Sequence, residues 1–569
     1  MHVKIDGIIV EVQSGMTILQ AAKKIGVEIP TLCYLEGIHE LGICRICVVE
    51  VEGAKTLMPA CITKVTDGMN IYTHTARVRR ARKTVLELIL SEHPDECLIC
   101  NKNNKCELQK LAIEMNIQQK RYEGEHATRI IDDKSPAIIR DSGKCILCRR
   151  CLTVCSQVQD VWSIAPIGRG FKTVIAPAGK DPLIESPCVQ CGQCINVCPT
   201  GAITEKNDIA KVWKALEDPT IHTVIQVAPA VRVAIGEEFG LDPGTPVTSQ
   251  MVSALKRLGF DRVFDTNFAA DLTIMEEGNE LLQRIEHNGK LPMITSCSPG
   301  WINYLEYFYP QLITHLSTCK SPQQMFGAVI KTYYAQITNI PAEKLFTISA
   351  MPCTAKKYES QRPEMCSSGY RDVDAVLTTR ELGTMLREVG IDLVTCNQET
   401  FDEPFGLGSG AGAIFGNTGG VMEAALRTIY ELVTGKALED ITFHQVRGLE
   451  GVKEAQIMLE DMELRVAVVH GLGNVKDILE DIMHDKSPYH FIEIMCCPGG
   501  CIGGGGQPLS KDPQVLQKRI NGLYKEDESL PLRKSHEHPA IQQLYDEFLG
   551  EPLSHKSHEL LHTHYKKRH

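Results

Sequence analysis

Cysteines concentrate near the start of this 569-residue chain, where fifteen of the 23 fall within the first 198 residues. The clearest group has the spacing C-x2-C-x2-C-x3-C-P and comprises Cys188, Cys191, Cys194 and Cys198, followed by Pro199. This spacing is typical of the thiolate ligands of a [4Fe-4S] cluster. The pattern therefore predicts that this part of the chain transfers electrons.

A second group repeats the spacing without the proline and comprises Cys145, Cys148, Cys151 and Cys155. In paired groups of this kind, the last cysteine of each completes the neighbouring cluster. We expect one cluster on Cys145, Cys148, Cys151 and Cys198, and another on Cys188, Cys191, Cys194 and Cys155. Disulfides and zinc ribbons are the alternatives, but a zinc knuckle leaves no role for the third closely spaced cysteine. Residues 137–209 are thus predicted to be a bacterial ferredoxin domain with two [4Fe-4S] clusters.

Residues 1–78 carry another cysteine set, placed among short predicted strands and one helix. It has the order C-x10-C-x2-C-x13-C, formed by Cys33, Cys44, Cys47 and Cys61. A tight pair with a remote fourth ligand is typical of [2Fe-2S] ferredoxins, and a zinc site is the alternative. The segment resembles the β-grasp [2Fe-2S] domain found in NADH dehydrogenase large subunits and in long hydrogenases.

Residues 79–125 are predicted to be helical and contain a histidine among three cysteines: His93, Cys97, Cys100 and Cys106. A histidine in such a run can be a solvated bystander. Here the order H-x3-C-x2-C-x5-C resembles the [4Fe-4S] segment of the same two families, which implies that His93 is a ligand. A neutral imidazole in place of a thiolate reduces the charge of the cluster and favours its reduction.

The sequence pattern changes after the cysteine-rich region. Cysteines become sparse from residue 210, and apolar strand patterns alternate with helices and glycine-rich loops, which predicts an α/β domain over 210–510. A chain of this length divides into several domains. The net charge of -11 argues against a nucleic-acid partner. We expect no secretory signal and no membrane span, and thiols grouped for metal suggest a cytoplasmic location.

Three segments in this second half match the signatures of [FeFe] hydrogenases: "TSCSPGW" at 295–301, "MPCTAKKYE" at 351–359 and "EIMCCPGGCIGGGGQP" at 493–508. The resemblance continues through "DLTIMEE" at 271–277, "KSPQQ" at 320–324, "GSGAGAIFGNTGGVMEAALR" at 408–427 and "RKSHEHPA" at 533–540. Residues 511–569 resemble the small-subunit segment of that family. The fold class that this implies is α/β and α+β multidomain, with a large catalytic domain after the cluster domains.

The resemblance implies an H-cluster, which is a [4Fe-4S] cubane joined to a diiron unit with CO, CN⁻ and an azadithiolate bridge. Its cubane ligands would include Cys353, Cys497 and Cys501, with Cys501 bridging to the diiron unit. The full cofactor set would be one [2Fe-2S] cluster, three accessory [4Fe-4S] clusters and the H-cluster.

The first signature departs from the family pattern, which has two adjacent cysteines, a proton relay and then the fourth cubane ligand. Here these positions hold Cys297 and Ser298. Ser298 could ligate as an alkoxide, Cys297 could move to the cubane while Ser298 relays, or Cys319 or Cys496 could substitute. Thiolate softness favours Cys297 on the cluster.

The resemblance also implies a proton relay formed by Cys297, Glu277, Ser317, Glu280 and Arg284. Glu277 and Glu280 are three residues apart on a predicted helix and can share one face, although a solvated helix face is the ordinary explanation of such a run. Residues implied to line the diiron pocket are Lys356, Met351, Met495, Ala228, Pro229 and Gln323.

The sequence therefore predicts an enzyme that catalyses reversible reduction of protons to H₂. Electrons would pass to or from ferredoxin or a flavoprotein NAD(P)-linked subunit, and hydrogenase maturation proteins would assemble the diiron unit. Two rival hypotheses are a hydrogen-sensing or weakly active paralogue, and an electron-transfer subunit resembling the NADH dehydrogenase large subunit. The latter family lacks counterparts of "MPC" and "CPGGC".

Overall fold

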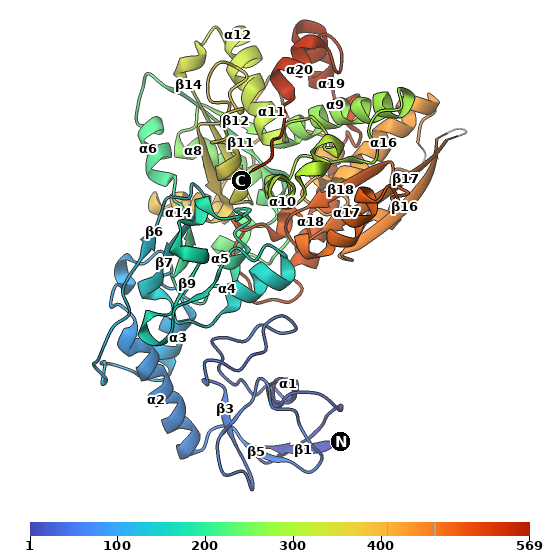
Figure 1. The fold of residues 1–569 in the computed structure, drawn as a ribbon. Helices are drawn as coiled ribbons and strands as arrows, with labels where there is room; N and C mark the ends of the chain where they lie inside the picture. Colours follow the sequence, from blue (N-terminus) through green and yellow to red (C-terminus); the bar gives the residue numbers. More distant parts are fainter. Residues whose placement is uncertain (407, 439, 460–461, 569) are drawn as a thin grey trace. The chain divides into compact units, whose positions relative to one another are not determined.

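The computed structural model describes residues 1–406, 408–438, 440–459 and 462–568. The chain divides into two compact units (Figure 1). Unit 1 comprises residues 1–186 and 193–204, and unit 2 comprises residues 187–192 and 205–569. Among the described residues, no helix combines the length and apolarity that crossing a bilayer requires.

Unit 1 begins with a five-stranded sheet in the order β2-β1-β5-β3-β4. Its strands are β1 (His2–Ile5), β2 (Ile8–Glu11), β3 (Val48–Val51), β4 (Met58–Pro59) and β5 (Asn70–Tyr72). β1 and β5 are parallel, whereas β1–β2, β3–β4 and β3–β5 are antiparallel. Helix α1 (Ile18–Lys24) starts at a capping box of Thr17 and Gln20 and buries its apolar side. This mixed sheet with one helix confirms the predicted β-grasp fold.

The rest of unit 1 consists of short elements joined by loops. Helices α2 (Ala76–Glu92) and α3 (Glu107–Glu114) form the predicted helical segment, and α4 (Arg150–Thr153) and α5 (Gln193–Val197) lie in the predicted ferredoxin domain. Two hairpins pair β6 (Ile131–Asp132) with β7 (Ile138–Asp141) and β8 (Ala165–Ile167) with β9 (Val174–Ala176).

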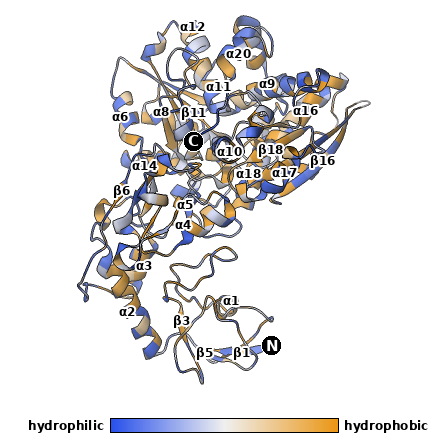
Figure 2. Ribbon diagram, viewed as in Figure 1, coloured by the Kyte–Doolittle hydropathy of each residue, from blue (hydrophilic) through white to orange (hydrophobic). Residues whose placement is uncertain are grey.

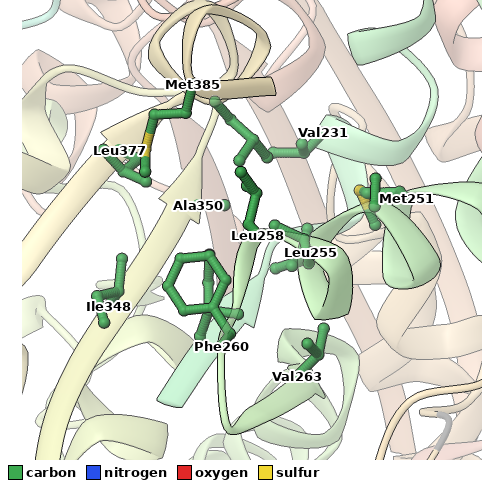
Figure 3. Close-up of a cluster of buried hydrophobic side chains, with 14 of the residues drawn as sticks. Val231, Met251, Leu255, Leu258, Phe260, Val263, Ile348, Ala350, Leu377 and Met385 are labelled. Atoms are coloured by element: carbon green, nitrogen blue, oxygen red, sulfur yellow. The ribbon is translucent and has the colours of Figure 1, made fainter. Parts of the chain in front are cut away.

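Unit 2 is built around a parallel sheet in the order β12-β11-β14-β15. These strands are β11 (His222–Val227), β12 (Arg262–Asp265), β14 (Leu345–Met351) and β15 (Ala375–Thr378). Helices α8 (Thr248–Leu258) and α14 (Thr379–Glu388) cover it. Figure 3 shows Leu258 of α8 beside Ala350 of β14, with Phe260 between Leu255 and Ile348, and all five are buried. Helices on a parallel sheet confirm the predicted α/β class.

A second sheet of unit 2 has the order β13-β18-β17-β16. Its strands are β13 (Met293–Ile294), β16 (Val452–Leu459), β17 (Met462–His470) and β18 (Phe491–Met495). β13 and β17 run parallel to β18, which is buried along its whole length and mostly apolar (Figure 2). The long helices α9 (Thr266–Glu286) and α16 (Gly420–Thr434) share its hydrophobic core.

The C-terminal segment is integrated into unit 2. It forms α18 (Val515–Ser529), α19 (Pro539–Leu544) and α20 (His555–Leu561). Leu544 and Leu561 are buried in one cluster with Phe268 of α9. Arg427 of α16 binds Asp527 of α18 at 2.9 Å, and neither side chain is exposed. These helices therefore complete the core of unit 2.

Candidate active site

The carboxyl ends of four parallel strands lead into one cavity of unit 2. β11 and β14 end there in the first sheet, and β13 and β18 end there in the second. Ligands of open α/β sheets bind outside the carboxyl ends of strands. The cavity brings together these residues predicted from the sequence: Ala228, Pro229, Cys297, Ser298, Gln323, Met351, Cys353, Lys356, Met495, Cys497 and Cys501.

Three of the cavity thiols lie close enough to affect one another. Burial raises the pKa of Cys353 well above its ordinary value, and Cys497 and Cys501 raise it further. Burial likewise raises the pKa of Cys501 to about 12. Thiolates become stable in such a water-poor pocket when they bind a metal, so the donor set fits an iron-sulfur cluster.

Glycines allow the backbone to close around this cavity. Gly500 has φ +89°, and a Cβ there would lie 2.7 Å from the backbone nitrogen of Thr418. A Cβ on Gly504 would lie 2.2 Å from the carbonyl oxygen of Pro352. The turn that carries Cys497 and Cys501 therefore requires residues without side chains, as its sequence indicates.

Lys356 is fixed at the cavity wall by two contacts. Its Nζ donates to the carbonyl oxygen of Cys297 at 3.1 Å and to Oε2 of Glu359 at 3.0 Å. Gln323 Nε2 also donates to Glu359 at 3.1 Å, while its buried Oε1 has no hydrogen-bond partner among the described residues. Glu359 was not predicted as a site residue, although its place three residues after Lys356 in the second signature was a usable signal.

Cys297 and Ser298 precede helix α10 (Pro299–Phe308) and have different neighbours. Burial raises the pKa of Cys297 well above its ordinary value, and the charge of Glu277 raises it further. Ser298 Oγ accepts a hydrogen bond from the backbone N–H of Cys496 at 3.1 Å. Cys496 also lines the cavity, whereas Cys319 lies beside Glu280, with Sγ 3.9 Å from Oε2.

Helix α9 carries three of the predicted relay residues on successive turns. Burial, together with the charge of Glu280, raises the pKa of Glu277 to about 8. Ser317 and the backbone of Ser296 lie near the Glu277 carboxyl group and act in the opposite sense by lowering its pKa, although neither carboxyl oxygen makes a hydrogen bond of ordinary geometry among the described residues. Glu280 accepts from Ser317 Oγ at 3.0 Å and from the Arg284 guanidinium at 2.6 Å. Burial thus favours the protonated form of Glu277, and hydrogen bonds connect Ser317 through Glu280 to the partly exposed Arg284.

In unit 1, the predicted [2Fe-2S] ligands also lie together. Cys47 Sγ is 3.3 Å from Cys61 Sγ, and the backbone N–H of Cys44 donates to Cys33 Sγ at 3.5 Å. The thiol of Cys33 lowers the pKa of Cys44 to about 6. Four sulfurs in this arrangement fit a [2Fe-2S] cluster.

His93 shares a cavity with Cys97, Cys100 and Cys106. Burial, followed by the charges of Lys120 and Lys144, lowers the pKa of His93 to about 4. Its Nδ1 is buried and has no hydrogen-bond partner among the described residues. A neutral imidazole with an unused nitrogen fits a metal ligand.

A further cavity of unit 1 is lined by Cys145, Cys148, Cys151 and Cys198, the crossed set expected for the first ferredoxin cluster. Burial raises the pKa of Cys145 to about 11 and that of Cys148 to about 12. The second set is divided between the units, with Cys155 and Cys194 in unit 1 and Cys188 and Cys191 in unit 2. That set stays a prediction from spacing.

Comparison with known families agrees with this division of sites. The model described as "Iron only hydrogenase large subunit, C-terminal domain" matches residues 221–505, half of the chain. The chain belongs to the iron-only hydrogenases. "Iron hydrogenase small subunit" matches residues 513–568, which form the C-terminal helices of this hydrogenase.

Three family models match the accessory region of the hydrogenase. They are a "2Fe-2S iron-sulfur cluster binding domain" over 1–76, an "NADH-ubiquinone oxidoreductase-G iron-sulfur binding region" over 82–121, and a "4Fe-4S dicluster domain" over 144–202. Iron-sulfur cofactors therefore accompany the H-cluster domain.

Individual relatives cover the hydrogenase from end to end. NADP-reducing hydrogenase subunit HndD of Solidesulfovibrio fructosivorans is 52% identical, covering 100% of this chain and 99% of that protein. Iron hydrogenase 1 of Clostridium pasteurianum is 41% identical, covering 99% of each. A solved variant of [FeFe]-hydrogenase HydA1 from Chlamydomonas reinhardtii is 46% identical with a TM-score of 0.57, covering 64% of this chain and 99% of that chain.

Proteins with other names share part of this resemblance. Cytosolic iron-sulfur assembly component 3 of Mus musculus is 30% identical over 400 residues, covering 66% of this chain and 82% of that protein.

Proposed function

We propose that this chain catalyses the reversible reduction of protons to H₂ at an H-cluster held in the unit 2 cavity. The observation that carries the proposal is the convergence of Cys353, Cys497 and Cys501 with Cys297, next to the buried acid Glu277. Metal ligands and a proton donor at one cavity are what heterolytic H₂ chemistry requires.

Within the cavity we assign roles to individual side chains. Cys353, Cys497 and Cys501 would hold the cubane. Ser298 would be its fourth ligand in place of Cys297, which thiolate softness favoured, because Ser298 Oγ accepts a hydrogen bond from the backbone N–H of Cys496. When bound, the cofactor supplies an open coordination position on iron and an amine base. Lys356 presents a fixed positive charge to the anionic ligands, and Met351 and Met495 exclude water from the cavity.

Proton transfer is assigned to the residues along α9. Cys297 would pass protons between the cavity and Glu277, whose protonated form burial favours. Glu277 then exchanges protons through Ser317 with Glu280. Arg284 holds the Glu280 carboxylate in place at the edge of unit 2.

For electron transfer, we propose one [2Fe-2S] cluster on Cys33, Cys44, Cys47 and Cys61, one [4Fe-4S] cluster with His93 as a ligand, and two ferredoxin [4Fe-4S] clusters. The sulfur distances near Cys47 and the free Nδ1 of His93 support the first two. The cavity around Cys145 and Cys198 supports the third.

We propose a flavoprotein NAD(P)-linked subunit as the electron partner, in preference to ferredoxin. The relative of 52% identity is named as a subunit of an NADP-reducing hydrogenase, and residues 82–121 match a segment of NADH-ubiquinone oxidoreductase. Dedicated hydrogenase maturation proteins would supply the diiron unit. Co-purification from the native host tests the partner, and recovery without a flavoprotein would favour ferredoxin.

Two other functions are possible for this architecture, a hydrogen sensor and an iron-sulfur assembly factor. The complete set of Cys297, Glu277 and Glu280 favours turnover over sensing. End-to-end similarity to two hydrogenases, against 66% coverage for the assembly component, favours a hydrogenase over an assembly factor.

Infrared spectroscopy of the full chain, matured anaerobically, tests the proposal. Intrinsic CO and CN⁻ bands together with H₂ production from a reduced viologen are expected. A sample with complete iron loading, produced with active maturation proteins but lacking these bands, would refute an H-cluster in this cavity. Bands without measurable turnover would instead support the sensor.

A further inference from the structure

Glu280 is a branch point for hydrogen bonds. Its carboxylate binds Ser317 and Arg284, the predicted relay. The same Oε2 that accepts from Ser317 also accepts from the backbone N–H of Thr318 at 3.0 Å and lies 3.2 Å from Thr318 Oγ1. The connections of Thr318 lead in a different direction from those of Arg284.

Thr318 joins Glu280 to the C-terminal helices. Its Oγ1 lies 2.8 Å from Nδ1 of His562, which directly follows α20. The His562 ring contacts that of His558, with centroids 4.3 Å apart and the ring planes tilted by 42°. His562 is buried whereas His558 is exposed, so this row of side chains runs from the interior to solvent.

The surroundings of His562 hold its ring in position. Nε2 lies 3.0 Å from Oε2 of Glu276, which also accepts from Tyr545 Oη at 2.5 Å and from the backbone N–H of Leu553 at 3.0 Å. A carboxylate at Nε2 favours the tautomer with its proton there and leaves Nδ1 to accept one from Thr318. The other titratable groups near His562 are Glu280, Cys319, His558 and His564.

We propose that protons also enter and leave through a second branch formed by Thr318, His562 and His558. The proposal rests on the H₂ chemistry assigned to the cavity and extends its relay beyond Glu280. For an outgoing proton, the O–H bond of protonated Glu280 breaks as its proton moves to Thr318 Oγ1. The Thr318 hydroxyl proton moves to Nδ1 of His562. The resulting imidazolium, paired with Glu276, becomes neutral again when its ring turns and one N–H bond breaks towards the adjacent His558 ring, which exchanges its proton with solvent.

Side-chain chemistry distinguishes the two branches. Arginine remains protonated in proteins, so Arg284 can orient Glu280 but cannot itself release a proton to water. Histidine takes up and releases a proton near neutral pH. A hydroxyl group both donates and accepts, which lets Thr318 pass a proton without becoming charged. The histidine branch therefore has proton-carrying groups from Glu280 to the exposed His558, joined by hydrogen bonds as far as His562 and by ring contact from there.

The test compares Thr318→Val and Thr318→Ser in the matured full chain. Valine keeps the shape of threonine but removes the hydroxyl group, and a loss of turnover of about tenfold is expected because proton relays contribute at least that much. Serine restores the hydroxyl group and should recover most of the turnover. Both variants should keep the CO and CN⁻ bands of the parent, because Thr318 does not line the cofactor cavity.

His558→Ala supplies a second measurement that a purely structural role would not affect. Added imidazole should restore its turnover at pH 7, while His555→Ala, an exposed histidine on the same helix, should show no loss and no response. The proposed second branch alone would be overturned if all three variants kept the CO and CN⁻ bands and matched the parent in turnover. These variants are Thr318→Val, Thr318→Ser and His558→Ala. A parent protein without CO and CN⁻ bands would instead overturn the proposed function.

Discussion

The backbone N–H of Cys496 donates a hydrogen bond to the hydroxyl oxygen of Ser298 at 3.1 Å. A hydrogen bond from an amide stabilises an oxygen that carries negative charge, so this contact supports Ser298 as an alkoxide ligand. Cys496 supplies the contact through its backbone, which leaves its thiol as the competing ligand.

Substitutions at Ser298 and Cys496 distinguish the two candidates for the fourth cubane ligand. We expect Ser298→Cys to keep the cubane, Ser298→Ala to lose it, and Cys496→Ala to keep it, as measured by iron content and Mössbauer spectroscopy of chain produced without maturation proteins. If Cys496→Ala loses the cubane while Ser298→Ala retains it, the thiol is the fourth ligand.

Glu277→Gln should lower H₂ turnover by about 10²- to 10⁴-fold, the usual contribution of a positioned acid or base. Glutamine fills the same space but cannot transfer a proton. CO and CN⁻ bands should persist, which separates proton transfer from cofactor assembly. Glu286→Gln, on the exposed end of the same helix, is the matched control and should retain full turnover.

The pH dependence of turnover should follow the pKa of Glu277, which burial raises to about 8. Below this pH the group holds a proton, so proton reduction should proceed and then decline as pH rises through about 8. H₂ oxidation needs the deprotonated form and should increase over the same interval. Profiles of both directions with artificial electron carriers measure this, and parallel profiles would contradict the assignment.

The raised pKa of Glu277 also affects the stability of the folded protein. Because the folded-state pKa of Glu277 lies above its ordinary value of 4.5, the folded protein binds the proton more tightly than the unfolded chain does. This stabilising contribution is complete below about 4.5 and is lost as pH rises through about 8. Glu277→Gln should flatten the pH dependence of the thermal midpoint in that interval. If the slope does not change, other titratable groups cause the pH dependence.

His93→Ala should remove one accessory cluster, because Nδ1 of His93 is the unused nitrogen in its cavity. His93→Cys should retain the cluster at a lower reduction potential, since a thiolate adds negative charge. Redox titration followed by electron paramagnetic resonance distinguishes these outcomes. A His93→Ala protein with unchanged iron content and spectrum would show that His93 is not a ligand.

Arg427→Met should destabilise unit 2 by about 1.5–3 kcal/mol, the usual contribution of a hydrogen bond to a charged group. Each of its two buried carboxylate partners keeps one guanidinium, because Arg447 binds Glu423 at 2.7 Å and Arg533 binds Asp527 at 2.6 Å. Arg427 binds Glu423 at 2.7 Å and Asp527 at 2.9 Å, with all three side chains buried. Lys476→Met, which removes an exposed pair with Glu480, should change stability by less than about 1 kcal/mol. Thermal unfolding of the two variants provides the comparison.

Local patterns made the fold class and the grouping of cysteines predictable. Helical spacing predicted helix α9, whereas the β-grasp sheet and the cavity that joins Cys353 to Cys501 were implied by the resemblance of short motifs to known families. The crossed set of Cys145 and Cys198 was predictable because ferredoxin ligand spacing has a strong chemical constraint.

Contacts between residues far apart in sequence were not predictable in this way. Glu276 and His562 are 286 positions apart, and no local pattern relates them. The hydrogen bond between Cys496 and Ser298 depends on how two strand ends meet. Segment 187–192 belongs to unit 2, although the spacing of its cysteines places it in the ferredoxin motif. Packing contacts, and not cysteine spacing, decide how the chain divides into its two units.

The C-terminal helices matched by the small-subunit family are covalently continuous with the catalytic domain. Translation therefore produces both parts in equal number, and the tether gives the helices a high effective concentration at their binding surface. After transient detachment, α18 and α20 would rebind at a rate independent of protein concentration. Dilution, which dissociates a separate subunit, would leave these helices bound to the catalytic domain.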